Sequence, residues 1–320
     1  MHRWLYGKRC EEADHMMRYV YNQCQSPIID GLVNEWRMEA PDWKRNEQIH
    51  GIFTILKYVY GLGIADYLPW LEVFDLDGHK TILKYAIKSD SNKNPLLSIE
   101  EIKAEIIEIM LAAVDNPSNA VEWILAEMIN QPNILHRTCQ ELDQVVGRDR
   151  LVDESDLSKL NYVKACVKEA FRLHPIVPFN VPHVSSKDTI VGGYFIPKGS
   201  QVLLSRLGLG RNPRIWEDPL VYKPERHIVN KESEVVLVDH ELRMLSFSTG
   251  RRGCPGIVLG STMTTILLAR LIQGFSWTAP PNGPSNIDLV ESEGDMVKAM
   301  PLIAHAVPRL EPHVYSKLVS

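Results

Sequence analysis

The ten residues FSTGRRGCPG, from Phe247 to Gly256, place one cysteine among three glycines directly before a long apolar stretch. Glycine at positions 250, 253 and 256 lets the backbone turn tightly and approach a flat ligand closely. A helix beginning just after the cysteine favours a thiolate at Cys254, because a helix N terminus stabilises negative charge. The segment therefore offers a candidate ligand-binding cysteine. The alternative is a small buried cysteine in a helix-capping loop, which is the usual environment of an isolated free cysteine.

The composition of the chain is that of an ordinary globular protein. Of its 320 residues, 45% are hydrophobic and 23% are charged, which excludes a disordered, collagen-like or low-complexity chain. The net charge of -5 argues against a nucleic-acid partner, because a protein that binds phosphate backbones needs an excess of basic residues. The five cysteines are odd in number and form no CxxC pair, so neither a disulfide framework nor a zinc site is indicated.

Hydrophobic periodicity predicts a mainly helical chain. Pro132 begins one predicted helix, Gly147 ends it, and Pro175 follows the end of the next. Residues 11–60 have a helical character, but residues 25–46 show no clear period and receive no assignment. The helices predicted beyond residue 90 cover residues 98–131, 132–146, 160–173 and 257–274.

Neither end of the chain predicts a membrane anchor. The segment 257–274 is the most apolar one, but it carries Ser261, Arg270 and several threonines, so it predicts a buried helix rather than a membrane span. The amino terminus is charged and has no apolar signal region. We therefore expect no anchor within these 320 residues.

A short β-rich part interrupts the helices. Residues 189–191 and 194–196 are β-branched or aromatic and flank Gly192-Gly193, which predicts a hairpin, and residues 201–204 predict a third strand. There is no internal repeat and no Gly/Ser linker. The expected fold is mainly α with a small antiparallel β part, in a single domain spanning residues 1–320.

Three motifs, taken together and in order, resemble those of cytochrome P450 enzymes. The cysteine segment resembles the haem-binding loop F-x-x-G-x-R-x-C-x-G of that family, and Glu169-Ala170-Phe171-Arg172 resembles its E-x-x-R pair. Residues 224–227, Pro-Glu-Arg-His, resemble its P-E-R segment, with His227 where phenylalanine is more usual. The resemblance implies the cytochrome P450 fold, haem b as cofactor, and Cys254 as the axial ligand of the haem iron. A thiolate ligand pushes electron density onto iron and assists O–O cleavage.

The resemblance also assigns roles around the haem. Glu169, Arg172 and Arg226 would form a buried charge network that braces the cysteine loop, which is a structural role. In isolation Glu169 and Arg172 would be an ordinary solvated helix pair. The residues that would contact the haem are Arg252 and His183 at its propionates, Phe247 shielding the sulfur, and Gly250 and Gly256 where the backbone comes close. The alternative for His183 is a surface histidine after a strand turn.

The helix over residues 98–131 contains a departure from the family pattern. Where the family has an acid followed by threonine, this chain has Asp115 followed by Asn116 and Pro117. Asp115 keeps the acid that would relay protons to bound oxygen, and Asn116 replaces the alcohol, so both are predicted catalytic residues. Pro117 removes one backbone donor and predicts a kink.

Three longer runs resemble the plant amino-acid N-monooxygenases. They are AVDNPSNAVEW at residues 113–123, the 174–183 segment ending PFNVPH, and SFSTGRRGC at residues 246–254. Such enzymes hydroxylate an L-amino acid twice on nitrogen and release an aldoxime, with loss of water and carbon dioxide. The resemblance implies O2, NADPH-derived electrons delivered by an NADPH–cytochrome P450 reductase, and a substrate side lined by Phe179, Asn180 and Val181. Residues 254–256 (CPG) and 279–281 (APP) favour the branch that takes valine, isoleucine or phenylalanine.

The resemblance is incomplete. Relatives are longer and carry an amino-terminal anchor to the endoplasmic reticulum membrane, facing the cytosol, together with a first sheet and early helices. We therefore expect a cytochrome P450 fold incomplete at the amino terminus, with membrane contact only through that anchor. The segments near residues 21–48 and 88–95 also look compressed. Two alternatives stay open: a haem-thiolate isomerase or dehydratase, which the missing threonine favours and Asp115 disfavours, and a non-enzymatic truncated remnant.

Overall fold

The computed structural model describes residues 2–25, 35–37, 99–230, 233–281, 283–293 and 296–319. The chain divides into two compact units. The first unit consists of Met1–Glu39 and Asn116–Ser320, and the second consists of Ala40–Asp115. Helix α4 (Ile99–Asn130) belongs to both units, and the remaining described elements lie in the first. Helix α4 continues through Pro117, so this proline does not end the helix.

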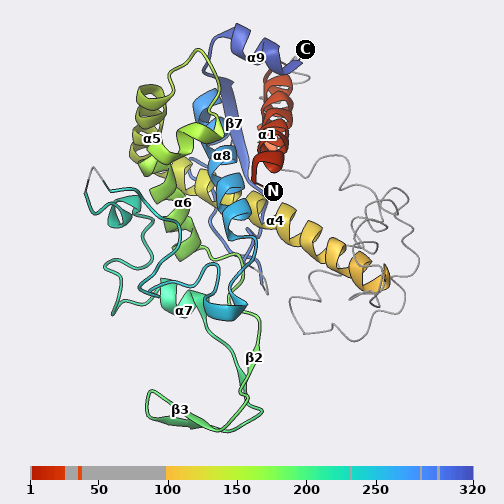
Figure 1. Ribbon diagram of the computed structural model, residues 1–320. Helices are drawn as coiled ribbons and strands as arrows, with labels where there is room; N and C mark the ends of the chain where they lie inside the picture. Colours follow the sequence, from red (N-terminus) through yellow and green to blue (C-terminus); the bar gives the residue numbers. More distant parts are fainter. Residues whose placement is uncertain are drawn as a thin grey trace. The chain divides into compact units, whose positions relative to one another are not determined.

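The first unit is built around three helices that pack against one another, α5 (Pro132–Val145), α6 (Asn161–Leu173) and α8 (Ile257–Gly274) (Figure 1). All three were predicted, and their observed bounds agree with the sequence to within about one turn. Gly147 has φ +82°, a left-handed conformation that glycine adopts readily just beyond a helix. A 3-10 helix, η3 (Glu154–Lys159), connects α5 to α6. Asp153 is its N-cap residue and forms a capping box with Asp156.

Helix α8 lies in the core, as its sequence predicted. Leu268, Leu271 and Ile272 are fully buried, and Arg270 donates hydrogen bonds to the Val152 and Cys10 carbonyl oxygens and pairs with Asp14. Within the described residues, α8 is the one helix long and apolar enough to cross a membrane, with a mean hydropathy of 1.4. Its packing against other helices of the unit accounts for that apolar character.

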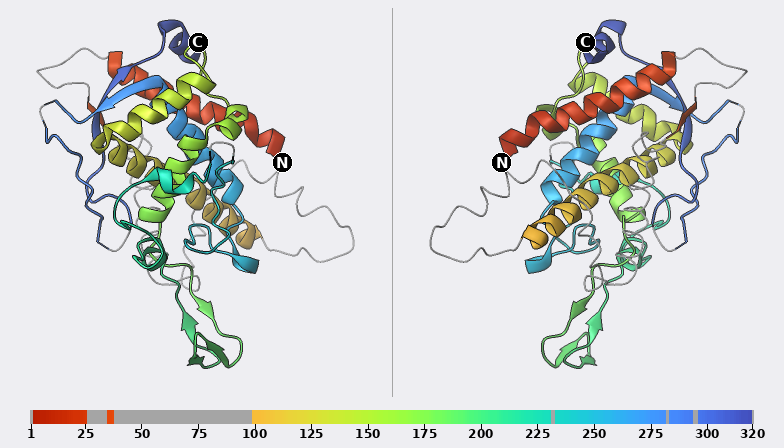
Figure 2. Two further views of the ribbon diagram at one scale, coloured as in Figure 1. Left: turned by 90° about the vertical axis from the view of Figure 1, so that its left-hand side faces the viewer. Right: turned by 90° about the vertical axis from the view of Figure 1, so that its right-hand side faces the viewer.

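An antiparallel sheet of three strands packs beside these helices and contacts α8 through β6. Strand β7 (Ile303–Pro308) lies between β6 (Phe275–Thr278) and β1 (Glu35–Arg37), with Trp277 opposite Ala306 and Trp36 opposite Ala304. Helix α1 (His2–Gln25) packs against α8, β7 and the last helix, α9 (Pro312–Val319), so the first and last helices lie together (Figure 2). Strand β1 lies within residues 25–46, which showed no clear period and received no assignment from the sequence.

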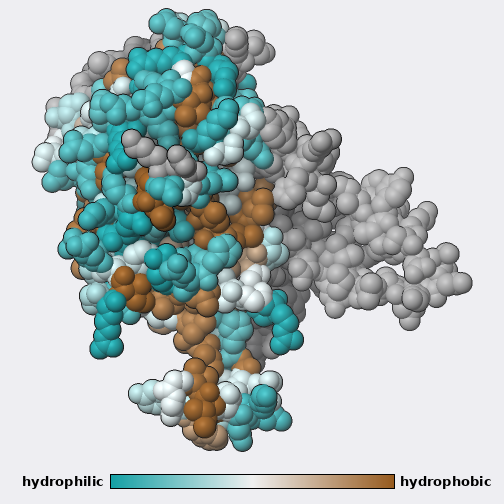
Figure 3. Space-filling model, turned by 60° about the vertical axis from the view of Figure 1, so that its left-hand side comes forward, coloured by the Kyte–Doolittle hydropathy of each residue, from teal (hydrophilic) through white to brown (hydrophobic). Residues whose placement is uncertain are grey.

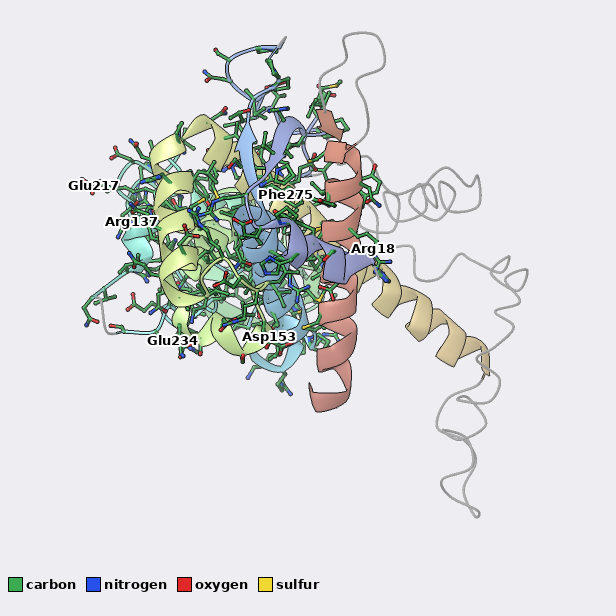
Figure 4. The ribbon with its side chains drawn as sticks, turned by 90° about the horizontal axis from the view of Figure 1, so that it is seen from above. Arg18, Arg137, Asp153, Glu217, Glu234 and Phe275 are labelled. Carbon is green, nitrogen blue, oxygen red and sulfur yellow. The ribbon has the colours of Figure 1, made fainter. Side chains whose placement is uncertain are left out.

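Phe275 marks the middle of the core. Its side chain is fully buried where α8 passes into β6, and its ring contacts those of Trp277 and Tyr315 at centroid distances of 5.9 and 5.8 Å. Figure 4 shows Phe275 among densely packed side chains, whereas Arg137 and Glu217 lie at the periphery. The core therefore joins the α5/α6/α8 layer to the sheet as one packed body.

One β-rich arm, formed by two pairs of short strands, projects from the first unit (Figure 1). Strands β3 (Thr189–Val191) and β4 (Tyr194–Ile196) pair as predicted around Gly192 and Gly193, whose φ angles are both positive. The predicted third strand is shorter than expected, β5 (Gln201–Val202), and pairs with β2 (His183–Val184) rather than with the hairpin. Figure 1 shows the β3–β4 hairpin as part of this arm, and Figure 3 shows apolar surface along the arm. Its exposed side chains are Ile190, Val191, Tyr194 and Phe195.

Candidate functional site

The cysteine loop is a compact turn. Residues Gly250–Arg252 form a 3-10 turn, η5, in which Gly250 takes φ +70° and its carbonyl oxygen accepts from Gly253 N–H at 3.1 Å. The Cys254 N–H donates to the Phe247 carbonyl oxygen at 2.9 Å and closes the loop. Glycine at 250 is needed because other residues adopt this φ only with strain. The loop therefore fixes the Cys254 backbone.

Cys254 differs from the other cysteines in its exposure. It is exposed, whereas Cys10, Cys24 and Cys139 are half-buried and Cys166 is fully buried. Burial raises the pKa of each of those four thiols, in the case of Cys24 to about 11. Since the thiolate is the form that ligates metals, burial makes those four poor ligands. Cys254 is the thiol that an external group can reach.

The loop lies against the start of α8 and the end of α6. Gly256 occupies the N-cap position of α8, where an added Cβ would lie 3.9 Å from the Cys254 sulfur. The Phe247 ring meets the Phe171 ring edge to face at 5.3 Å, and Ser246 Oγ donates to the Phe171 carbonyl oxygen at 3.1 Å. Phe171 thus carries the connection between the cysteine loop and α6.

One turn of α6 carries a buried charge network. Arg172 donates from Nε and Nη2 to the two oxygens of Glu169, at 2.9 and 2.7 Å, and both side chains are fully buried. Arg226, in the 3-10 helix η4 (Pro224–His227), donates to the same carboxylate at 3.0 Å. The three residues that the resemblance assigned to one network therefore lie in contact. Such buried charges are stable only when hydrogen bonds satisfy them.

His227 is a further member of this network. Its Nε2 lies 2.7 Å from Glu169 Oε2, and the side chain is almost fully buried. Burial alone would raise the pKa of Glu169, but the hydrogen bonds and charges of Arg172 and His227 lower it to about 2. Burial lowers the pKa of His227, and the Glu169 carboxylate opposes that effect. Glu169 is thus an anion at neutral pH, with donors on both oxygens.

The network also fixes the loops after α7 (Arg206–Gly210). Arg172 Nη1 donates to the carbonyl oxygens of Gly210 and Pro219, the latter at 2.7 Å, and Lys223 N–H donates to Glu169 at 2.9 Å. A Cβ on Gly210 would overlap the Arg172 carbonyl oxygen, so only glycine allows this approach. The α6 charge cluster therefore holds α7 in place.

The residues predicted to line the substrate side differ in their surroundings. Phe179 and Val181 are exposed, at 47% and 66%. Asn180 is buried, and its side chain is occupied: Oδ1 accepts from Leu204 N–H at 2.6 Å and Nδ2 donates to His183 Nδ1 at 2.8 Å. With Nδ1 accepting, the neutral His183 ring carries its proton on Nε2. Asn180 thus orients His183 and ties its loop to Leu204.

Arg252 is exposed beside the cysteine. Asp115 and Asn116 are consecutive residues of α4, and both are half-buried. Asp115 falls at the end of the second unit and Asn116 at the start of the stretch assigned to the first.

Sequence reasoning missed two features of the site. The first is a second buried polar cluster, in which His174 Nε2 lies 2.8 Å from Glu127 and its ring stacks on Trp123 at 4.0 Å. Glu291 Oε1 lies 3.6 Å from Nδ1 of this histidine and pairs with Arg211, and these two neighbours lower the pKa of Glu291 to about 2. The sequence contains no motif that predicts contact between residues so far apart along the chain.

The second missed feature is Arg206, at the start of α7. Its side-chain Nε is buried, and within the described residues it has no hydrogen-bond partner. Burial lowers the pKa of Arg206, and the negative charge of a Cys254 thiolate opposes that effect. The available signal was a lone arginine inside the otherwise uncharged run 202–209.

Comparisons with known proteins agree on one family. The family model for cytochrome P450 matches residues 72–301. A solved zebrafish cytochrome P450 structure with abiraterone superposes with a TM-score of 0.64 at 24% identity, over 83% of this chain and 61% of that chain, and shows the same fold. The predicted fold is therefore confirmed.

Closer similarity is found among curated plant proteins. The phenylalanine N-monooxygenase of Prunus mume is 47% identical over 375 aligned positions, which cover 98% of this chain and 70% of the relative. Valine N-monooxygenase 1 of Manihot esculenta is 47% identical over 98% of this chain and 68% of its own length. Because each alignment is longer than this chain, the relatives contain internal segments without a counterpart here. A match of this extent and identity means that the chain belongs to the cytochrome P450 family, whose cofactor is haem b.

Proposed function

We propose that this chain is a haem-thiolate monooxygenase that N-hydroxylates an L-amino acid to its aldoxime. The observation that carries the proposal is the 44–47% identity, over 98% or more of the chain, to relatives named phenylalanine, valine and tyrosine N-monooxygenases. We infer a valine, isoleucine or phenylalanine substrate from the CPG and APP segments at residues 254–256 and 279–281. The reaction uses O2 and NADPH-derived electrons.

The residues around Cys254 suit a haem. An exposed sulfur on a rigid loop is a soft ligand for iron, and it supports one axial bond. Val258, in the first turn of α8 after Cys254, is an exposed apolar side chain that a flat apolar macrocycle would cover. The buried, unpartnered Nε of Arg206 is a positive group beside the sulfur. Haem, a flat apolar macrocycle that carries acidic propionates, complements this combination of sulfur, apolar surface and positive charge.

The roles of the chain's own residues follow from their geometry. Cys254 would bind the iron, and the bound haem would supply the oxygen-activating chemistry. Arg252 and the Nε2–H of His183 would donate to propionates, with Asn180 holding His183 in the required tautomer. Phe247, packed on Phe171, would keep water from the sulfur. Gly250 and Gly256 would let the backbone approach the macrocycle.

The remaining predicted residues would act on the substrate. The Asp115 carboxylate would hold and move protons, with Asn116 beside it as a neutral donor and acceptor. Exposed Phe179 and Val181 would supply apolar contact to the amino-acid side chain. Asn180, being buried and hydrogen-bonded, would position these two neighbours.

The partner and the location follow from the family. Cytochrome P450 monooxygenases receive electrons from a redox partner, and plant members are typically membrane-bound. We infer that the partner here is NADPH–cytochrome P450 reductase and that the site of action is the cytosolic face of the endoplasmic reticulum.

The experiment is a carbon-monoxide difference spectrum of the reduced 320-residue protein, beside Cys254→Ser. We expect a strongly red-shifted Soret band in the wild type and its loss in the variant, because the shift requires a thiolate ligand. Turnover of phenylalanine, valine and isoleucine with NADPH and reductase should then yield aldoximes detectable by mass spectrometry. A thiolate band with NADPH-independent conversion would favour an isomerase or dehydratase, and absence of any haem band would identify a non-enzymatic remnant.

A further inference from the structure

Arg206 is held in place by the backbone around it. Its N–H donates to the Pro178 carbonyl oxygen at 2.8 Å, and the preceding Ser205 caps α7 by accepting from Gly208 N–H at 2.9 Å. At the other end of α7, Arg211 donates twice to the Leu173 carbonyl oxygen, at 2.9 and 2.7 Å. A five-residue helix clamped at both ends fixes the position of the Arg206 stem.

The guanidinium of Arg206 lacks the partner that comparable arginines have. Arg172 pairs with Glu169, Arg211 with Glu291 and Arg270 with Asp14. Arg206, in contrast, has a buried Nε without a hydrogen bond, and within the described residues no carboxylate forms an ion pair with it.

An unpaired, partly buried cation is costly unless an anion joins it. Burial depresses the pKa of Arg206, yet a guanidinium stays charged at any physiological pH. The nearby negative charge is that of Cys254, which an iron atom would largely neutralise. The position therefore calls for a second anion, and a planar guanidinium prefers a carboxylate.

We propose that Arg206 binds a carboxylate presented beside Cys254, and that this carboxylate is a propionate of the haem. The inference rests on haem binding as set out under the proposed function. The amino-acid substrate also carries a carboxylate, but the Arg206 backbone is bonded to Pro178, in the segment that carries His183, and the charge of Cys254 acts on Arg206. Because Cys254 and His183 are the residues that would hold the haem, we assign the carboxylate to the haem. Arg206 is thus a cofactor-binding residue in addition to Arg252 and His183.

The test compares haem with haem dimethyl ester, whose propionates carry no charge. Wild-type protein, Arg206→Gln and Arg206→Lys are stripped of haem and reloaded with either compound, and haem loss to excess apomyoglobin is followed. With haem, Arg206→Gln should release the cofactor roughly tenfold faster or more, as loss of a charge-assisted hydrogen bond predicts. Arg206→Lys should recover most of that difference. With the dimethyl ester, the wild type and Arg206→Gln should match.

Arg214→Gln is the matched control, because Arg214 is exposed on the same segment. Equal haem loss from wild type and Arg206→Gln, or an equal acceleration with the dimethyl ester, would overturn the proposal, the latter because it indicates a purely structural role. A second titration distinguishes the source of the carboxylate. If Arg206→Gln weakened the spectral binding of phenylalanine but not of phenethylamine, and left haem loss unchanged, the assignment to haem would be wrong.

The two proposals fail in different ways. A thiolate-type carbon-monoxide band with no effect of Arg206→Gln removes the Arg206 assignment and leaves the monooxygenase proposal standing. A wild-type protein that takes up neither haem nor its ester overturns both.

Discussion

Glu169 shows how much of the site depends on one carboxylate. It is fully buried and accepts hydrogen bonds from Arg172, Arg226 and the Lys223 backbone, with His227 on its second oxygen. The Arg172 guanidinium in turn holds Gly210, and Phe171 on the same turn of α6 holds Phe247. A defect at Glu169 therefore reaches both α7 and the cysteine loop.

The substitution Glu169→Gln should destabilise the protein by about 3–5 kcal/mol, since it leaves two arginines buried without their counter-charge. The measurement is urea unfolding followed by tryptophan fluorescence. Glu217→Gln is the control, because the Glu217 side chain is 84% exposed and lies at the periphery in Figure 4. A change below about 0.5 kcal/mol for Glu169→Gln would contradict the network's structural role.

The pKa of Glu169 also predicts how stability depends on pH. In the folded protein it is about 2, below its ordinary value of 4.5, so the unfolded chain binds the proton more readily. This contribution to stability is fully present above about pH 4.5 and is lost as the pH falls toward 2. Urea midpoints at pH 7, 4.5 and 3 should fall over the last interval and fall less in Glu169→Gln. Parallel decreases in both proteins would argue against a depressed pKa.

At the scale of elements, the position of α7 depends on residue 210 being glycine, because a side chain there would overlap α6. Gly210→Ala should cost about 1–3 kcal/mol by overpacking, because the new Cβ overlaps the Arg172 carbonyl oxygen. Gly260→Ala is the matched comparison, since its Cβ would meet only Phe247 at an ordinary 3.8 Å and alanine favours a helix interior. Thermal unfolding of both variants measures the difference. Equal melting temperatures would show that α7 shifts without cost.

The elements differ in how far the sequence could predict them. Helices α5, α6 and α8 follow from apolar periodicity with proline or glycine at their ends, and the β3–β4 hairpin follows from Gly192-Gly193. Strand β1 has three residues, too few for a period, and its partner β7 lies far along the chain. Strand β5 was placed correctly but its pairing with β2 depends on tertiary structure, which local pattern does not encode.

The same division applies to the site. The cysteine loop and the α6 pair are contiguous motifs, so their residues could be named from the sequence. The Asn180–His183 bond, the position of Arg206 and the Glu127–His174–Glu291 cluster join residues from separate segments. Only the folded backbone brings those groups together.

At the scale of the molecule, the two ends of the chain stabilise each other. The rings of Tyr21 in α1 and Tyr315 in α9 stack at 4.3 Å with 9° between their planes. Tyr315 is 1% exposed, donates to the Gly274 carbonyl oxygen and accepts from Leu310 N–H at 3.0 Å. It thus joins α1, α8 and α9.

Tyr315→Ala should lower the free energy of unfolding by about 3–5 kcal/mol, the usual range for a buried aromatic side chain. Limited proteolysis with mass spectrometry should then show new cleavage within α1. Tyr194→Ala provides the control, because Tyr194 is 78% exposed and should change stability by less than about 0.5 kcal/mol. Unchanged cleavage of α1 would mean that α1 stays docked without this ring.

The unequal exposure of the five thiols has a practical consequence. Alkylating reagents react with accessible thiolates, so in the folded protein they should mark Cys254 well before the four cysteines whose pKa burial raises. An iron–sulfur bond would remove that reactivity. The number of alkyl groups per chain would then give the fraction of molecules that carry cofactor, without any optical measurement. Mass spectrometry of a mixed preparation would distinguish alkylated chains from chains protected by the cofactor.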